Sequence, residues 1–241
     1  GGALRLAGNG EAAHLALIAP YIRGSREPEL LAALGLDERA AGDNVRARKF
    51  LEAAIAGKVA RPRAYLELAR IRYAAVLRTV ADKEDKRLSR AQVADVVEPL
   101  AAARSIPPPM AEVYELAAEV FSRSLARPTR DDVRFVNEGV VRFLRRPLLL
   151  VRGAELNLRY GDPEDARKLI EYGLKTLPMS PARIALASLS DDLPPLPLGA
   201  PAAPTTQPAA PKSDTPKKSA PPSPPGSGAD LLRQDGKTTR P

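Results

Sequence analysis

Two stretches of the chain share a spaced pattern of small and bulky apolar residues. Each has a Gly-Asp pair, then a small residue, a bulky apolar residue and a second small residue. These are Gly42, Asp43, Ala47, Leu51 and Ala54 in the first stretch, and Gly161, Asp162, Ala166, Ile170 and Gly173 in the second. Intervals of three and four residues place the apolar side chains on one helix face. The pattern therefore predicts an amphipathic helix after each Gly-Asp turn.

Prolines stand at a fixed distance before these two turns. Pro28 and Pro62 are 34 residues apart, and so are Pro147 and Pro181. Proline is favoured at the first position of a helix, so each of the four should begin one. The spacing and the Gly-Asp turns together resemble the tetratricopeptide repeat, a helix–turn–helix unit of 34 residues.

The resemblance implies an all-α fold, a right-handed α-solenoid of stacked antiparallel helix pairs. Helices are expected over Pro28–Ala40, Asn44–Ala56, Pro62–Leu77, Ser89–Arg104 and Pro181–Ser190, with further repeats starting at Met110 and Pro147. A charged insertion, residues 78–88, separates the two helices of the second repeat. Pro99 should interrupt the second of them, because proline lacks the backbone N–H of a helix interior.

Local signals support several of these helices. Asp43 and Asp162 stand where an N-cap is needed, and Ser89 with Gln92 and Thr129 with Asp132 have capping-box spacing. Glycine inside a helix costs about 1 kcal/mol relative to alanine. The helical glycines Gly35 and Gly173 therefore predict contacts that leave no room for a methyl group.

Domain organisation follows from the repeat starts and from a change in composition. We interpret residues 1–27 as the end of a truncated repeat. Residues 28–190 form the repeat domain, in which the helix over 181–190 caps the array. Residues 191–241 hold 13 of the 25 prolines and no aromatic residue. They cannot bury enough apolar surface to offset the entropy of ordering, so we predict a disordered tail.

Charge and composition narrow the function only slightly. The formal net charge is +8, and all but one unit lies outside the tail. The chain has no cysteine, and its apolar runs are too short to span a bilayer. It begins Gly1-Gly2 without a visible leader, and we expect it to be the C-terminal part of a larger bacterial protein. A cytoplasmic location is favoured, while a secreted or periplasmic one stays open if a leader is missing.

No catalytic or metal-binding pattern is present in the sequence. His14 is the single histidine, and without cysteine or a second histidine a zinc site is not expected. The acidic groups lack the spacing of a calcium loop. We assign no catalytic, cofactor or metal residues and expect this segment not to be an enzyme.

The resemblance implies a concave groove, lined by the first helix of each repeat, that binds an extended peptide. Family positions place eight candidate residues in it: Arg39, Arg63, Leu66, Arg70, Tyr73, Tyr114, Phe121 and Arg159. Arginine pairs with carboxylates, and tyrosine offers a rigid amphipathic contact. An alternative is that these side chains pack against neighbouring repeats or face water; Tyr73 and Phe121 in particular suit a core.

Three functions therefore stay open. The first is a non-catalytic scaffold that binds a protein or peptide in the groove. The second is a helical appendage of a larger enzyme whose catalytic domain lies upstream of residue 1. The third, less favoured, is electrostatic nucleic-acid binding by the basic helical part, which would depend steeply on salt.

Overall fold

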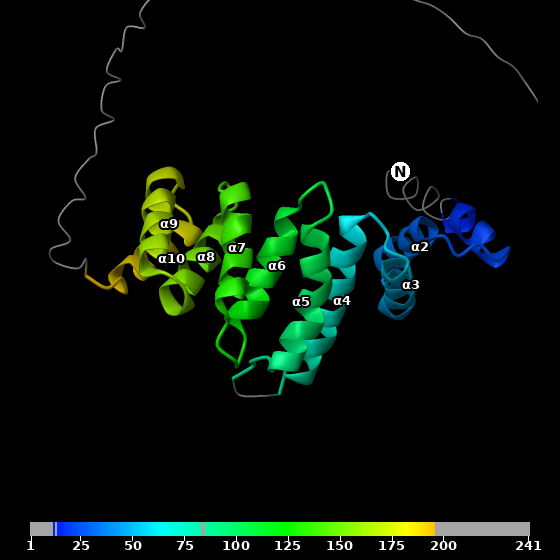
Figure 1. Ribbon diagram of the computed structural model, residues 1–241, viewed down its shortest axis with the longest axis horizontal. Helices are drawn as coiled ribbons and strands as arrows, with labels where there is room; N and C mark the ends of the chain where they lie inside the picture. Colours follow the sequence, from blue (N-terminus) through cyan, green and yellow to red (C-terminus); the bar gives the residue numbers. More distant parts are fainter. Residues whose placement is uncertain (1–11, 13, 83–84, 196–241) are drawn as a thin grey trace, which may run out of the picture. The chain divides into compact units, whose positions relative to one another are not determined.

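The computed structural model describes residues 12, 14–82 and 85–195. Helices joined by short connections make up most of these residues (Figure 1). Residues 14–22 are helical. The labelled helices are α2 (Pro28–Ala40), α3 (Asn44–Ala56), α4 (Pro62–Thr79), α5 (Arg90–Arg104), α6 (Ala111–Ser122), α7 (Arg130–Arg142), α8 (Pro147–Tyr160), α9 (Pro163–Thr176) and α10 (Pro181–Asp191). Four helices begin at the four prolines that define the 34-residue spacing, as predicted.

The helices pack in sequential pairs, α2 with α3, α4 with α5, α6 with α7 and α8 with α9. We call the first member of each pair an A helix and the second a B helix. Each A helix also contacts the next A helix along the chain, and α8 contacts α10. The surface formed by α2, α4, α6 and α8 is the A-helix face. This all-α array of helix pairs confirms the predicted fold class.

The predicted caps are present. Asp43 accepts hydrogen bonds from the backbone N–H groups of Val45 (3.1 Å) and Arg46 (2.9 Å). Ser89 opens α5 and Thr129 opens α7, each with a complete capping box. These bonds satisfy backbone donors that have no partner inside the helix, so the starts of the B helices are encoded locally.

Two expectations for the second repeat are wrong. The helix α5 passes through Pro99 without a break, since one proline removes a single hydrogen bond and its side chain is buried in the array. The helix α4 continues to Thr79, so the insertion is shorter than expected. The C-terminal end of the insertion is held by two backbone hydrogen bonds, both at 2.8 Å. Leu88 N–H donates to the Arg123 carbonyl, and Leu125 N–H donates to the Leu88 carbonyl.

The close contacts predicted at the helical glycines are confirmed. A Cβ atom on Gly35 would lie 2.7 Å from Leu51 Cγ, between α2 and α3. A Cβ atom on Gly173 would overlap the side chain of Leu186 in α10 and lie 2.9 Å from Leu150 Cδ2 in α8. Both glycines therefore allow neighbouring helices to approach more closely than alanine would.

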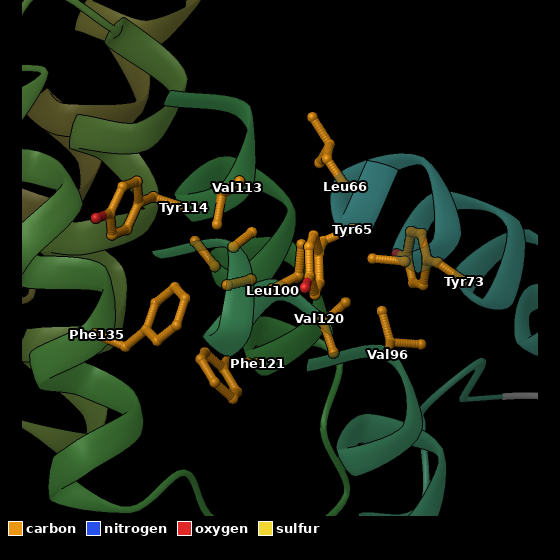
Figure 2. Packing of buried hydrophobic residues seen from close by; sticks show 14 of the residues in the cluster. Tyr65, Leu66, Tyr73, Val96, Leu100, Val113, Tyr114, Val120, Phe121 and Phe135 are labelled. Atoms are coloured by element: carbon orange, nitrogen blue, oxygen red, sulfur yellow. The ribbon is translucent and has the colours of Figure 1, made fainter. Parts of the chain in front are cut away.

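The core runs between the helix layers and includes several tyrosines and phenylalanines (Figure 2). The ring of Tyr114 in α6 lies 5.4 Å from that of Phe135 in α7, and Phe121 lies 6.4 Å from the same ring, measured between centroids. Aromatic pairs at these distances add to the burial of apolar area. The centre of the array is thus fixed by aromatic contacts between α6 and α7.

Buried tyrosines give the protein a pH-dependent stability. Burial, aided by a hydrogen bond to Glu138, raises the pKa of Tyr114 to about 12, and burial with a hydrogen bond to Glu119 raises the pKa of Tyr73 too. An unfolded tyrosine ionises near pH 10, so above that pH the unfolded chain releases protons that the folded chain retains. Stability should therefore fall as the pH rises from about 10 to about 12.

Urea unfolding at pH 9 and pH 11.5 tests this expectation. The wild-type chain should lose more unfolding free energy between the two pH values than a Tyr73→Phe/Tyr114→Phe variant, because the variant lacks both phenols. An equal loss in the two proteins would contradict it.

The predicted end pieces fall largely outside the described residues. Residues 1–11 and 13 belong to the proposed truncated repeat, and residues 196–241 form most of the proposed tail. The capping helix α10 is one residue longer than expected and ends at Asp191.

Candidate functional site

Three arginines surround one buried glutamate on the A-helix face. Arg63 and Arg70 lie one turn before and one turn after Glu67 on α4, and each places a guanidinium nitrogen 2.8 Å from Glu67 Oε1. Arg39 reaches across from α2, with its Nε 3.4 Å from Glu67 Oε2. Helical spacing brings the first two together, and packing of α2 against α4 adds the third.

The glutamate of this cluster is buried and the three arginines are partly exposed, and positive charges outnumber the negative one. The Glu67 side chain is 7% exposed, whereas those of Arg39, Arg63 and Arg70 are 33–49% exposed. One carboxylate cannot neutralise three guanidinium groups, so two positive charges are left over at the surface. The buried glutamate thus fixes the arginines in place while their outer N–H groups stay open to a ligand.

A second group of polar side chains forms contacts between α4 and α6. The Tyr73 hydroxyl donates to Glu119 Oε1 at 2.8 Å, and Arg123 Nη2 lies 3.6 Å from the same oxygen. Arg152 on α8 is close enough to act on the Tyr73 phenol electrostatically. Polar side chains of three consecutive A helices, α4, α6 and α8, therefore lie in one region.

A third group lies on α8. Glu155 accepts from Arg152 (3.1 Å) and pairs with Arg159 (3.2 Å), at helical spacings of three and four residues. We call the charged residues of all three groups the arginine strip. Its members are Arg39, Arg63, Glu67, Arg70, Glu119, Arg123, Arg152, Glu155 and Arg159. Six arginines face three glutamates, so the strip has a surplus of three positive charges.

The structure divides the eight sequence-derived candidates into two sets. Arg39, Arg63, Arg70 and Arg159 are solvent-accessible members of the arginine strip. The other four, Leu66, Tyr73, Tyr114 and Phe121, are buried in the aromatic and aliphatic core (Figure 2). They occupy helix faces that meet neighbouring helices, so they support the surface and do not form its floor.

Sequence reasoning missed the residue that organises the strip. Glu67 occupies a helix position outside the family's peptide-contact set. A signal was available, because Arg63 and Arg70 flank it at intervals of four and three residues, the spacing of helical ion pairs. The contact from Arg39, 28 residues earlier, had no local signal.

The arginine strip presents charged hydrogen-bond donors at the surface of the protein. Guanidinium groups held by a buried carboxylate present planar N–H donors to a second carboxylate or to another oxyanion. Among the described residues, no group of histidine, cysteine, aspartate and glutamate side chains could hold a metal ion.

His14 contacts Asp37 Oδ2 at 2.5 Å, and this contact links the helix over 14–22 to α2. No described helix is both long and apolar enough to cross a membrane.

Comparison with known proteins gives structural likenesses at low sequence identity. No family model matches the sequence, and no curated protein gives a significant match. A thermophilic TPR protein of Thermus thermophilus, TTC0263, is similar at 19% identity and a TM-score of 0.45, over 78% of this chain and 93% of that one. The pilF protein of Pseudomonas aeruginosa is 13% identical, with a TM-score of 0.49 and coverage of 78% and 79%. The assembly chaperone of RpL4, Acl4, is 18% identical, with a TM-score of 0.46 and coverage of 79% and 81%.

Proposed function

We propose that this chain is a protein-interaction scaffold that binds an acidic segment of a partner protein along the A-helix face. The observation that supports this most is the surplus of arginine around Glu67. A charge-assisted hydrogen bond to a carboxylate contributes roughly 1.5–3 kcal/mol, and the strip offers several such bonds in a row. An extended segment with spaced aspartates or glutamates would match it.

The organisation of the strip favours recognition over simple attraction. Arg63 and Arg70 are held by the same oxygen of Glu67, so little side-chain entropy is lost when they meet a ligand. Arg39 is additionally fixed by donating to Asn44 Oδ1 at 2.6 Å. Pre-organised donors of this kind give specificity for the position of a carboxylate as well as for its charge.

Affinity capture with two matched variants tests the proposal. An Arg63→Gln/Arg70→Gln variant removes two strip charges and leaves Arg39 on Glu67. An Arg48→Gln/Lys49→Gln variant removes the same charge from exposed positions on α3. We expect acidic proteins held by the wild-type chain to bind the first variant at least tenfold more weakly and the second unchanged.

Circular dichroism should show that both variants remain folded, since the substituted side chains are exposed or half-buried. Purified partners should also bind more weakly as salt rises, because the interaction is largely electrostatic. Equal capture by both variants would refute the assignment of the A-helix face. Capture of nucleic acid in place of acidic protein would favour the electrostatic alternative.

A further inference from the structure

A groove runs between the B helices α7 and α9. No Cα atom of α7 lies within 8 Å of a Cα atom of α9, although both helices contact α8 between them. Three hollows of about 520, 230 and 480 Å³ follow one another along this gap. The first and second share Asn137 and Asp165, and the second and third share Val141. They therefore form one continuous depression, which we call the α7–α9 groove.

The helix α8 forms the floor of the first hollow, through Asn157 and Tyr160. At Gly153, side chains of α7 and α9 approach α8 closely: a Cβ atom there would lie 2.7 Å from Val140 Cγ2 and 3.5 Å from Leu169 Cδ1. One turn further on, Asn157 is buried and exchanges two hydrogen bonds with Asn137 of α7, at 2.7 and 3.0 Å. Because these amides satisfy one another, the floor is rigid.

The walls of the groove expose apolar side chains. Val141 is 73% exposed and Leu144 is 37% exposed, beside the partly buried Leu169 and Tyr172. Contiguous exposed apolar surface that is rimmed by polar residues is typical of an interaction site. Val45 on α3 is also highly exposed, at 82%, but it does not line the α7–α9 groove. A substitution at Val45 is therefore a matched control for one at Val141.

The rim of the groove is charged differently at its two ends. Arg142, Arg145 and Arg146 cluster where α7 turns into α8. Arg142 pairs with Glu138, and Arg146 pairs with Glu115, while Arg145 forms no ion pair with a described residue. At the other end, Arg130 and Arg134 balance Asp162 and Asp165. A ligand that fits would be apolar along its length and acidic at the end near Arg145.

We propose that the α7–α9 groove binds an amphipathic helix of a partner protein, with its apolar side on Val141 and Leu169 and an acidic end at the Arg142–Arg146 turn. Thirteen residues of α7 give a wall about 20 Å long, which matches a helix of three to four turns. Docked helices lie about 8–10 Å from their neighbours, so a helix seated on these hollows would contact α7 and α9 together. Anchors at i, i+3 or i+4, and i+7 would reach the floor. This site is separate from the A-helix face and does not depend on it.

Panning a displayed library of 16-residue helical peptides against the wild-type chain tests the proposal. We expect enriched peptides with leucine, isoleucine or phenylalanine at i, i+3 or i+4, and i+7, and with aspartate or glutamate at one end. Their affinity should fall at least tenfold for Val141→Glu and remain unchanged for Val45→Glu. Both substituted valines are highly exposed, so circular dichroism should show two folded proteins.

Three results would overturn the proposal. The first is a library without enriched sequences, or with sequences that bind Val141→Glu as tightly as the wild-type chain. The second is weakened binding to the Arg63→Gln/Arg70→Gln variant alone, which would place the peptides on the A-helix face. The third is self-association of the wild-type chain that Val141→Glu abolishes in sedimentation experiments, because the occupant would then be a second copy.

Discussion

Replacing Gly139 with alanine is expected to destabilise the protein by about 2 kcal/mol or more. Gly139 lies in α7, directly against the base of the Tyr114 ring in α6, and a Cβ atom there would overlap Tyr114 Cβ and Cγ. Tyr114 is fully buried, touches Phe135 and Phe143, and donates its hydroxyl to Glu138. The ring therefore has no free space into which it could move.

Two opposing effects decide whether this substitution raises or lowers the free energy of unfolding. Alanine favours the helix over glycine by about 1 kcal/mol, whereas overpacking a filled core costs about 1–3 kcal/mol and sometimes more. At Gly139 the overlap is with three atoms at the base of the Tyr114 ring, so the packing cost should reach the upper end of this range, about 3 kcal/mol, and exceed the helical gain by about 2 kcal/mol. The α6–α7 contact would have to separate to admit the methyl group.

Thermal and urea unfolding of Gly139→Ala measure this effect. The melting temperature should fall by roughly 4–8 °C, given about 2–4 °C per kcal/mol for a domain of this size. Arg134→Ala on the same helix serves as a control, because its ion pair with Asp131 is exposed. A Gly139→Ala protein as stable as the control would show that α6 and α7 lie further apart than described.

Replacing Glu67 with glutamine is expected to change stability and binding in opposite directions. The substitution preserves shape but leaves Arg39, Arg63 and Arg70 without the carboxylate that holds them. Removing one partner from a buried hydrogen-bonded charge leaves unfavourable charge behind. Because the arginines are partly exposed and screened, we expect a loss of roughly 1–3 kcal/mol of unfolding free energy.

The same change raises the positive surplus of the arginine strip from three to four. An acidic partner should then bind Glu67→Gln at least as tightly as the wild-type chain, even though the folded state is weaker. Glu164→Gln, which removes an exposed carboxylate paired with Arg167 on α9, should alter neither property. Parallel losses of stability and affinity in Glu67→Gln would mean that the ordering of the arginines by Glu67 contributes more to binding than the added positive charge.

Features that depend on local spacing could be predicted from the sequence. The caps at Asp43, Ser89 and Thr129 and the starts at proline follow from bonds within a few residues, so the sequence determines them directly. Gly35 and Gly173 also predicted their close contacts, because a glycine inside a helix needs a packing reason.

Features that depend on three-dimensional packing could not be predicted in this way. Pro99 was expected to interrupt α5, but burial in the array keeps the helix intact. Tyr114 was assigned to the groove, yet its contact with Gly139 places it in the core. The meeting of Arg39 with Glu67 depends on how α2 packs against α4. The α7–α9 groove depends on how α7 and α9 pack against α8, which no sequence pattern indicates.

The suggestion of a larger enzyme upstream of residue 1 stays a prediction, which the neighbouring coding sequence would test. For this segment we propose only that the A-helix face binds an acidic protein surface. Photo-crosslinking from that face tests the claim most directly. A benzoylphenylalanine in place of Arg159 reports on the A-helix face and leaves Arg152 to hold Glu155; one in place of Arg48 reports on α3.

In cells, we expect crosslinks to a partner protein from position 159 and not from position 48. Mass spectrometry should map the adduct to a segment rich in aspartate and glutamate. Crosslinks confined to position 48, or an adduct at position 159 without acidic residues, would contradict it.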